Sequence, residues 1–302
     1  MADVGFIGLG VMGAPMAINV LNGGNSLTVY DVRPEAVSRL VEAGAKAASS
    51  PRDVGAASEF VVTILPLPEH VESVVLGEDG IVHGLRPGGV VIEMSTIDPH
   101  TSKRVGDELQ QRGFDMVDSP VGKTSEHAET GTLTLMVGGE PETIERVTPV
   151  LNCMGSDTYY CGGRSSGHAM KMVNNLLATS IMAANVEAVA LGLKSGLKLD
   201  FMIDVMRTTM AWNNQLGVAM PKKAFIGDDS PGFMVNLAKK DVRLACEAAE
   251  RLGFEARVGR ATVNALQAAA DMGYGERDQA ALMRVLEEQL DIDARLEAPT
   301  NP

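Results

Sequence analysis

Aromatic side chains make up only 4% of this 302-residue sequence, and cysteine is scarcer still, with three residues. Cys153, Cys161 and Cys246 are odd in number and match no metal-binding or redox-active spacing, so the sequence predicts a reduced, cytoplasmic protein. The histidines are scattered, without the pairing that metal ligands show, so no catalytic metal is expected. They are His70, His83, His100, His127 and His168.

Positive charge is also in short supply. The chain has 26 lysines and arginines against 39 acidic residues, which gives a formal net charge of −13. A field of that sign argues against nucleic acids and anionic membranes as partners. It also means that a small anionic substrate needs a local basic site.

Long uninterrupted apolar runs are missing too. The longest apolar stretch, residues 176–193, is broken by Asn185 and Glu187, so it is not interpreted as a membrane span. Met1 leads into an apolar run without lysine or arginine, so neither a signal peptide nor a transit peptide is expected.

The residues that are present suffice for a large soluble core, since 45% are hydrophobic and 22% are charged. In the first half of the chain, short apolar runs that predict strands alternate with helical patterns. Strands are expected at residues 4–8, 26–30, 59–65, 90–94, 115–117 and 132–137, and helices at 12–22, 34–43 and 101–112. This alternation predicts an α/β fold with a mostly parallel, doubly wound sheet covered on both faces.

Beyond Gly162-Gly163 the pattern is helical throughout. Residues 170–195 are apolar nearly all round, which predicts a long helix that is buried on most faces and joins two domains. Further helices are expected at residues 200–210, 237–252, 260–272 and 278–290. The expected organisation is an α/β domain over residues 1–163, an all-α domain over 164–292 and a frayed tail over 293–302.

The stretch VGFIGLGVMGAPMA places Gly8, Gly10 and Gly13 between an apolar strand and a helix. In a dinucleotide-binding turn, such glycines let the backbone approach a pyrophosphate, and the helix N-terminus adds free N–H groups. Asp31, at the end of the second strand, is placed to bind the adenosine ribose. An acid there favours NAD over NADP, although Arg33 could pair with the extra phosphate of NADP. The alternative is an ordinary turn with a capping aspartate.

Gly122-Lys123-Thr124 has the ending of a nucleoside-triphosphate-binding loop. That loop is excluded because Val117 stands where its first glycine belongs and Pro120 lies inside it. The run lies at the junction of the two expected domains and is rich in small polar donors, so it predicts an anion-binding site for the substrate. The residues concerned are Ser119, Gly122, Lys123, Thr124 and Ser125. The alternative is a solvated loop lysine.

Lys171, Asn174 and Asn175 share one face of the long apolar helix. Buried lysine and asparagine need partners, so this polar group predicts a catalytic site rather than a solvated stripe. An ammonium near the nicotinamide would protonate the alkoxide that forms when a hydride reaches an aldehyde, and would take the proton back in reverse. Asn175 would orient the lysine or a substrate oxygen.

Three further groups are candidates for the site. Ser95 and Thr96 follow an apolar strand and lie at the sheet edge expected to face the nicotinamide, where Ser95 is expected to contact the substrate and Thr96 the cofactor. The alternative is a capping role, since hydroxyls at such positions also cap helices. Leu65-Pro66 ends the preceding strand and is placed to touch the cofactor ribose. The charged run Lys239, Lys240 and Asp241 is interpreted, on spacing alone, as a solvated helix face.

Taken together, these stretches resemble the β-hydroxyacid dehydrogenase family, the 3-hydroxyisobutyrate dehydrogenase group, over nearly the whole chain. The motifs that carry the resemblance are GFIGLGVMGAPMAINVL, ILP, EMSTIDP, DSPVGKTSEHAETGTLTLMVGG, GHAMKMVNNL and FMVNLAKKDVRLA. The resemblance implies an N-terminal Rossmann domain, an all-helical C-terminal domain, and NAD(P)-dependent interconversion of a β-hydroxyacid and its semialdehyde.

The resemblance also implies roles for individual residues. Lys171 matches the catalytic lysine, and Lys240 matches a lysine near the nicotinamide, which replaces the solvated interpretation for that residue alone. The positions that match cofactor contacts are Val11, Met12, Asp31, Leu65 and Thr96.

The chain departs from the family at one place. Where the family has Asp-x-Pro-Val-Ser-Gly-Gly, this sequence has Pro-Val-Gly-Lys-Thr-Ser, which is similar to the Pro-Val-Gly-Arg-Thr-Ser of the 3-sulfolactaldehyde reductase branch. In that branch the basic residue, helped by the asparagines that match Asn174 and Asn175, holds a sulfonate. Lysine keeps the charge of arginine but not its planar fork.

The expected activity is NAD-dependent reduction of a short anionic aldehyde to a primary alcohol, with 3-sulfolactaldehyde and 2,3-dihydroxypropane-1-sulfonate as the leading pair. The alternative substrates are carboxylate semialdehydes, namely methylmalonate, succinate or tartronate semialdehyde. A rival of another class is a non-catalytic NAD-binding interaction module. The apolar helix and the methionine-rich helical region also predict a homo-oligomer, a dimer or a tetramer.

Overall fold

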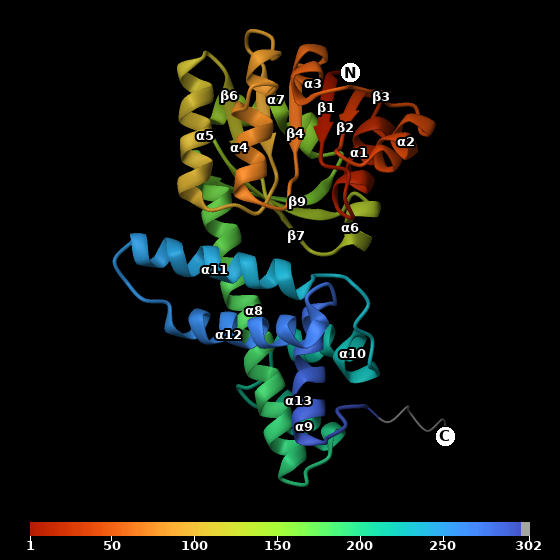
Figure 1. The fold of residues 1–302 in the computed structure, drawn as a ribbon, viewed down its shortest axis with the longest axis vertical. Coiled ribbons are helices and arrows are strands. Elements are labelled where there is room, and N and C mark those ends of the chain that lie inside the picture. Colours follow the sequence, from red (N-terminus) through yellow and green to blue (C-terminus); the bar gives the residue numbers. More distant parts are fainter. Residues whose placement is uncertain (297–302) are drawn as a thin grey trace. The chain divides into compact units, whose positions relative to one another are not determined.

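The computed structural model describes residues 1–296 and divides into two compact units (Figure 1). The first unit is residues 1–172 and the second begins at Val173. The first contains the sheet and the second is helical, so the predicted fold class is confirmed.

The centre of the first unit is a parallel sheet. Its parallel strands are β1 (Asp3–Ile7), β2 (Ser26–Tyr30), β3 (Lys46–Ala47), β4 (Phe60–Thr63), β5 (Val90–Glu93) and β6 (Asp115–Asp118), in the order β3-β2-β1-β4-β5-β6. Every residue of β4 and β5 is buried, as expected of strands covered on both faces. This order reverses direction between β1 and β4, and ligands of doubly wound sheets bind at such a switch point.

Three more strands extend the sheet, and in the described part of the chain it has nine. They are β7 (Val121–Gly122), β8 (Leu133–Gly138) and β9 (Gly155–Gly162). Strand β8 pairs antiparallel with β6 and β7 and parallel with β9. The sequence does not predict β9, because this strand is mostly exposed and has no apolar alternation.

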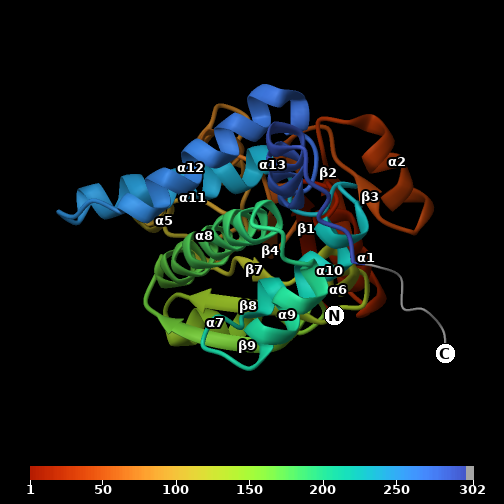
Figure 2. The same cartoon turned by 90° about the horizontal axis from the view of Figure 1, so that it is seen from below.

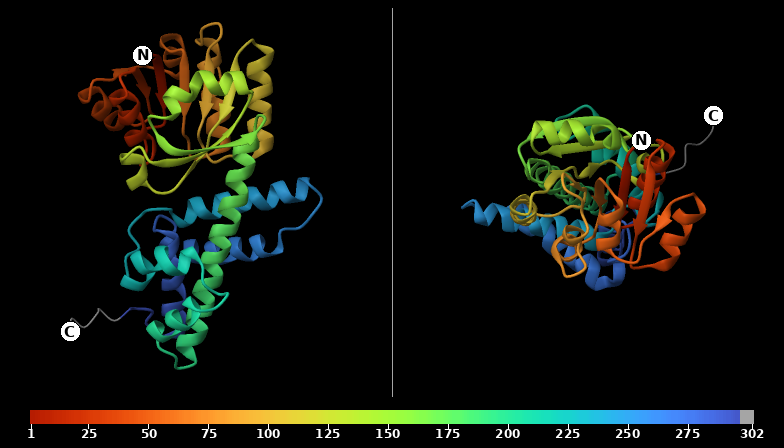
Figure 3. Two further views of the ribbon diagram at one scale, coloured as in Figure 1. Left: turned by 180° about the vertical axis from the view of Figure 1, so that it is seen from behind. Right: turned by 90° about the horizontal axis from the view of Figure 1, so that it is seen from above.

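Helices cover the sheet on both faces, and five of them begin at a proline, the residue whose fixed φ suits a first helical position. They are α1 (Gly13–Asn22), α2 (Pro34–Glu42), α3 (Pro51–Ala57), α4 (Pro68–Leu76), α5 (Pro99–Gln111), α6 (Ser125–Glu129) and α7 (Pro141–Leu151). Alternate residues of β1 feed two cores, Phe6 into the one that holds α1, α2 and α7, and Ile7 into the one that holds α3, α4 and α5. Figures 1 and 3 show α4 and α5 on one face and α7 on the other.

The second unit has a core of its own, which includes Met182, Phe225, Val242 and Leu266. Its longer helices are α9 (Leu199–Arg207), α11 (Val235–Arg251), α12 (Arg257–Ala269) and α13 (Leu282–Leu290), joined by the short α10 (Met220–Lys222) and single turns. Helices α11 and α12 lie side by side (Figures 2 and 3).

The C-terminal segment is better packed than the sequence suggested. Ala294 is fully buried, and the Leu296 N–H donates to the Phe225 carbonyl at 3.1 Å. The expectation of a frayed tail is therefore wrong for residues 293–296, and residues 297–302 lie outside the described part of the chain.

Helix α8 (Ser166–Lys194) carries the chain from the first unit into the second. It is long and apolar enough to cross a membrane by length and composition, but core helices of soluble proteins pass the same test. Its most apolar window is 44% buried, and Val173, Leu177 and Leu191 are exposed. The prediction of a helix buried on most faces is thus wrong for the isolated chain.

Candidate active site

The glycine-rich turn lies at the carboxyl end of β1, and its three glycines have different environments. Gly8 has φ +97°, and a methyl group there would lie 2.2 Å from the Ile64 carbonyl oxygen. A methyl group on Gly13 would lie 1.9 Å from the Gly8 oxygen. At Gly10 the nearest atom, on Arg33, is 4.0 Å away, so the backbone there faces open space. The outer glycines permit the turn, and the middle one leaves room for a ligand.

Helix α1 begins at this turn with its N-terminus available. Met12, the N-cap, makes no side-chain capping bond, and the Ala14 N–H donates to the Gly10 carbonyl at 3.0 Å. The positive end of the helix dipole is therefore not neutralised by a capping side chain and is left for another anion. Val11 is 63% exposed beside them. An exposed helix N-terminus behind an uncrowded glycine fits the pyrophosphate of a dinucleotide.

Asp31 follows β2, and its carboxylate is hydrogen-bonded to neighbouring residues of the protein. Its carboxylate accepts the Leu9 N–H at 2.6 Å and the Arg33 N–H at 2.9 Å, and the Arg33 Nε lies 3.2 Å away. Burial raises the pKa of this carboxyl, but the hydrogen bonds from Leu9 and Arg33 outweigh burial, so the net pKa is lowered. Asp31 is therefore an anion beside the turn, with an exposed arginine next to it.

The carboxyl ends of β4 and β5 meet at Ser95. This residue is buried, its N–H donates to Glu93 Oε1 at 2.6 Å, and its hydroxyl accepts the Leu65 N–H at 2.8 Å. Ser95, predicted to bind substrate, is therefore placed to join two strand ends instead. Thr96 is half-buried and Pro66 is exposed, so these two predicted cofactor contacts remain accessible.

Glu93 was not singled out from the sequence. It is fully buried, accepts hydrogen bonds from Thr63 and Ser95, and its pKa is raised to about 7 by burial. The negative charge of Asp118 raises it further, while the hydrogen bonds oppose the rise. An acid at the end of an otherwise apolar strand was the available signal.

Lys171 lies in the first turns of α8 and is half-buried. Its ammonium donates to the Val121 carbonyl oxygen at 2.7 Å, on the strand that leads into Gly122-Lys123. The predicted catalytic lysine and the predicted anion-binding run are therefore neighbours within the first unit.

Lys123 was predicted to bind the substrate anion, but in the structure it contacts groups of the protein. Its ammonium lies 2.6 Å from Asp157 Oδ2 and donates to the Thr132 carbonyl at 2.7 Å. The hydrogen bond from Lys123 lowers the pKa of Asp157. The lysine is exposed, as a solvated loop lysine would be, but its charge is compensated by Asp157. Nothing in the sequence around residue 157 pointed to this pair.

The rest of the Gly-Lys-Thr run is accessible only in part. Gly122 is buried in β7, whereas Thr124 is exposed and its hydroxyl lies 2.9 Å from His127 Nδ1. Ser125 opens the short helix α6.

In the second unit the predicted residues form one network. Asn174 Nδ2 donates to Asn175 Oδ1 at 3.0 Å, and Asn175 Nδ2 donates to Asp241 Oδ2 at 2.6 Å. Lys240 Nζ lies 2.9 Å from Asp241 Oδ1. Both Lys240 and Asp241 are buried, so the solvated-face interpretation of Asp241 is wrong.

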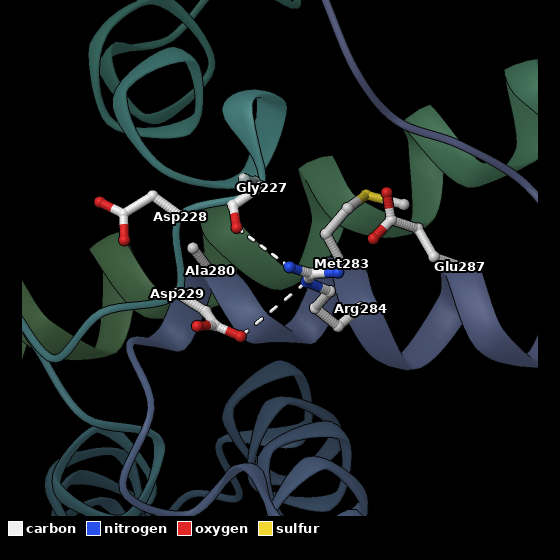
Figure 4. Close-up of a pocket in the computed structure, with 8 residues that line it drawn as sticks. Gly227, Asp228, Asp229, Ala280, Met283, Arg284 and Glu287 are labelled. Atoms are coloured by element: carbon white, nitrogen blue, oxygen red, sulfur yellow. Dashed lines mark hydrogen bonds and ion pairs between the residues drawn. The ribbon is translucent and has the colours of Figure 1, made fainter.

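A small cavity elsewhere in the second unit contains none of these residues (Figure 4). Its volume is about 10 Å³, room for no more than one water molecule. Arg284 closes it by donating to the Gly227 carbonyl at 3.0 Å and lying 3.9 Å from Asp229. It is too small for a substrate.

The strand order, the glycine turn and the acid after β2 define a dinucleotide-binding domain of the Rossmann type. Consistent with this, the family described as the NAD-binding domain of 6-phosphogluconate dehydrogenase matches residues 3–163. The family described as NAD-binding of NADP-dependent 3-hydroxyisobutyrate dehydrogenase matches residues 165–286.

Individual relatives agree over the full length. The chain is 39% identical over 298 residues to the 3-sulfolactaldehyde reductase of Escherichia coli strain K12, covering 99% of each protein. It is 36% identical over 293 residues to an NAD-dependent L-serine dehydrogenase of Pseudomonas aeruginosa, covering 95% of this chain and 98% of that protein. The structure of Mycobacterium tuberculosis 3-hydroxyisobutyrate dehydrogenase with L-serine matches at 29% identity with a TM-score of 0.85, covering 95% of this chain and 99% of that one.

This chain belongs to the β-hydroxyacid dehydrogenase family, and the resemblance stated from its motifs is confirmed. It is an oxidoreductase with nicotinamide-dinucleotide-binding domains, acting on hydroxyl groups. The family has both NAD and NADP users: one relative is named NAD-dependent, and a similar structure contains NADP⁺.

Proposed function

We propose that the protein is an NAD-dependent reductase that interconverts a short anionic aldehyde and its primary alcohol, with 3-sulfolactaldehyde and 2,3-dihydroxypropane-1-sulfonate as the pair. The observation that carries the proposal is the placement of Lys171, whose ammonium lies 2.7 Å from the Val121 oxygen beside the Gly-Lys-Thr run. The 39% identical relative is named for that substrate.

The chemistry divides between cofactor and protein. The dinucleotide, when bound, supplies the hydride that converts the aldehyde carbon into the alcohol carbon. The Lys171 ammonium donates a proton to the aldehyde oxygen as the hydride arrives, and the neutral amine takes a proton from solvent afterwards. In the reverse direction the amine accepts the alcohol proton. The residues that would hold the cofactor are Gly8, Gly10, Val11, Met12, Gly13, Asp31, Leu65, Pro66, Thr96 and Lys240.

The substrate anion is assigned to the basic run and the asparagines, as the sequence predicted. These residues are Gly122, Lys123, Thr124, Ser125, Asn174 and Asn175. Since Lys123 is paired with Asp157, its part requires exchange of that carboxylate for the sulfonate. Such an exchange is inexpensive, because both side chains are partly exposed and surface pairs contribute little.

The same ion pair favours a second candidate. If Lys123 keeps its ion pair with Asp157, only neutral hydrogen-bond donors are left to bind the substrate anion. This arrangement fits a 3-hydroxyisobutyrate-type dehydrogenase that acts on a carboxylate semialdehyde or a β-hydroxy amino acid. The relative named L-serine dehydrogenase fits this class. A non-catalytic NAD-binding module is the third candidate and predicts dinucleotide binding without turnover.

The deciding experiment measures initial rates of NADH oxidation with matched sulfonate and carboxylate aldehydes, for the wild type and Lys123→Ala. The control is Lys103→Ala, which removes another exposed lysine paired with an aspartate. A preference for 3-sulfolactaldehyde, with a KM raised selectively by Lys123→Ala, supports the sulfonate assignment. A preference for a carboxylate, with Lys123→Ala behaving like the control, rejects it and supports the second candidate.

Cofactor choice is a separate part of the proposal. The lowered pKa of Asp31 keeps a negative charge where NADP carries its extra phosphate, so NAD is preferred. Arg33 opposes this preference. Comparing kcat/KM for NADH and NADPH tests it, and equal values would reject it.

Self-association and location complete the proposal. Val173, Leu177 and Leu191 leave apolar surface exposed on α8, which suits burial in a homo-oligomer. Light scattering after size-exclusion chromatography checks this, and a monomer at micromolar concentration would reject it. The cysteines of the described chain are free, which fits a cytoplasmic protein.

A further inference from the structure

The first turn of α8 is fixed to the sheet by a buried carboxylate. Asp118, the last residue of β6, is fully buried. Its Oδ1 accepts the Ser165 N–H at 2.6 Å and its Oδ2 accepts the His168 N–H at 2.9 Å. These N–H groups belong to a helix N-terminus, where an anion is stabilised by the dipole as well as by the hydrogen bonds.

His168 makes a second attachment with its ring, which is fully buried. Its Nε2 lies 3.1 Å from the Ser95 carbonyl oxygen, and its Nδ1 lies 2.8 Å from the Ser102 hydroxyl. A carbonyl only accepts, so Nε2 carries a proton, while Nδ1 faces the Ser102 hydroxyl and, at 3.5 Å, the Asp118 carboxylate. The ring therefore joins α8 to the end of β5 and to α5.

Close packing leaves the turn no room to shift. A methyl group on Gly167 would lie 2.1 Å from the Met136 carbonyl oxygen of β8. A methyl group on Gly138 would lie 2.7 Å from both Asp118 Oδ1 and the Ser166 hydroxyl. The backbone of this turn thus rests directly on the sheet.

Lys171 follows His168 by three residues, close to one helical turn, so the two side chains project from the same side of α8. The position of the Lys171 ammonium depends on where this turn is held. Burying a polar imidazole costs more free energy than burying an apolar side chain of the same size, even when the ring is hydrogen-bonded. The proton transfer described above gives His168 no role that would account for this cost.

We propose that His168, seated on Asp118 and bonded to Ser95 and Ser102, is the positioning residue that holds Lys171 in place for proton transfer. The inference rests on the acid–base role given to Lys171 in the proposed function, but not on the identity of the substrate. Misplacing a reacting group by about 1 Å costs on the order of 100-fold in rate.

The test compares three substitutions. His168→Leu keeps most of the volume and removes both ring hydrogen bonds, whereas His168→Gln keeps a donor for the Ser95 carbonyl. His83→Gln is the control, because His83 is exposed and far along the chain from these groups. Each is made in the wild type and in Lys171→Met, and turnover is measured with the hydroxyacid or aldehyde that the wild type uses best.

We expect His168→Leu to lower kcat roughly 100-fold with little change in the KM for NADH, and His168→Gln to restore much of the loss. The primary isotope effect with deuterated NADH should rise, because proton and hydride transfer become rate-limiting. In Lys171→Met, which already lacks the reacting group, His168→Leu should add almost nothing. Without cofactor, hydrogen exchange should quicken around residues 165–171 and stay unchanged elsewhere.

Other results overturn the proposal. Equal losses from His168→Leu in both backgrounds, or faster exchange throughout the chain, would mean that His168 only stabilises the fold. A raised KM for NADH with unchanged kcat would mean that it acts on the Ser95 edge instead. Failure of the proposed substrate would appear separately, as a different preferred substrate of the wild type.

Discussion

Two buried carboxylates, Asp118 in the first unit and Asp241 in the second, hold their surroundings in different ways. Asp118 accepts backbone N–H groups from Ser165 and His168, which cannot turn away. Asp241 contacts two side-chain groups, the Asn175 amide and the Lys240 ammonium. Side chains can rotate away from the carboxylate, whereas the backbone donors of Asp118 cannot. A carboxylate held by backbone donors fixes a segment, and one held by side chains can exchange partners when a ligand arrives.

The same contrast extends to the lysines that accompany them. Lys171 follows the turn fixed by Asp118, as the proton transfer proposed for it requires. Lys240, beside Asp241, belongs to the network that can rearrange and was assigned to cofactor binding. Substitutions at the two carboxylates and at the two lysines test this difference.

The largest expected effect is on turnover. Lys171→Met should lower kcat by about 1,000-fold, within the range by which general acid–base groups contribute, with little change in the dissociation constant of NADH. Lys240→Met should act mainly on that dissociation constant. Fluorescence titration with NADH and steady-state rates check both, and similar effects of the two substitutions would erase the distinction.

Next in size is the effect on stability. Asp118→Asn presents an amide N–H₂ to fixed backbone donors and should lower the free energy of unfolding by about 3 kcal/mol, the upper range for a hydrogen bond to a charged group. Asp241→Asn should cost less than half as much, because Asn175 and Lys240 can reorient. Urea denaturation measures both, and the reverse ranking would mean that backbone donors hold a buried carboxylate no more firmly than side chains do.

A smaller effect concerns pH. The folded-state pKa of Glu93 is raised to about 7 from an ordinary 4.5, so the folded protein binds this proton more tightly than the unfolded chain. The stabilisation is complete below pH 4.5 and is lost as pH rises through about 7. Between pH 6 and pH 8 the wild type should lose about 1 kcal/mol through this group.

Glu93→Gln, which cannot ionise, is the control for that loss. Its urea midpoint should change less between pH 6 and pH 8 than the wild-type midpoint does. Identical pH dependence in the two proteins would show that Glu93 does not titrate in this window.

The smallest effect is expected at the surface. Asp157→Asn breaks the ion pair with Lys123 but should leave the urea midpoint unchanged, because both partners are partly exposed to solvent. It should instead lower the KM of an anionic aldehyde by releasing the Lys123 ammonium. A shifted midpoint with an unchanged KM would make the pair structural rather than a competitor of substrate.

Local patterns in the sequence predicted much of this molecule. Strand β2 was expected at residues 26–30, where it lies, because an apolar run between polar turns needs no distant information. Gly8, Gly10 and Gly13 were likewise predicted to form a dinucleotide-binding turn from their spacing between a strand and a helix. The polar face of the long helix pointed to Lys171 before any partner was known.

Several of the unpredicted features depend on partners distant in sequence. Lys123 meets Asp157, and His168 meets Ser95 and Ser102, across segments whose approach is decided by strand order rather than by neighbouring residues. Strand β9 carries no apolar periodicity because it is mostly exposed. Pairing of this kind becomes visible only when the sheet is assembled.

Lys123 has φ +76°, a conformation that glycine adopts freely and other residues adopt at a cost of about 1–3 kcal/mol. The family pattern has a glycine at this place. The backbone of the loop is therefore shaped for glycine, and a lysine occupies it. A substitution at this one position, glycine to lysine or the reverse, changes the charge of the loop without changing its backbone conformation. Specificity for the substrate anion is for that reason open to rapid evolutionary change, and to design, on a fold that stays the same.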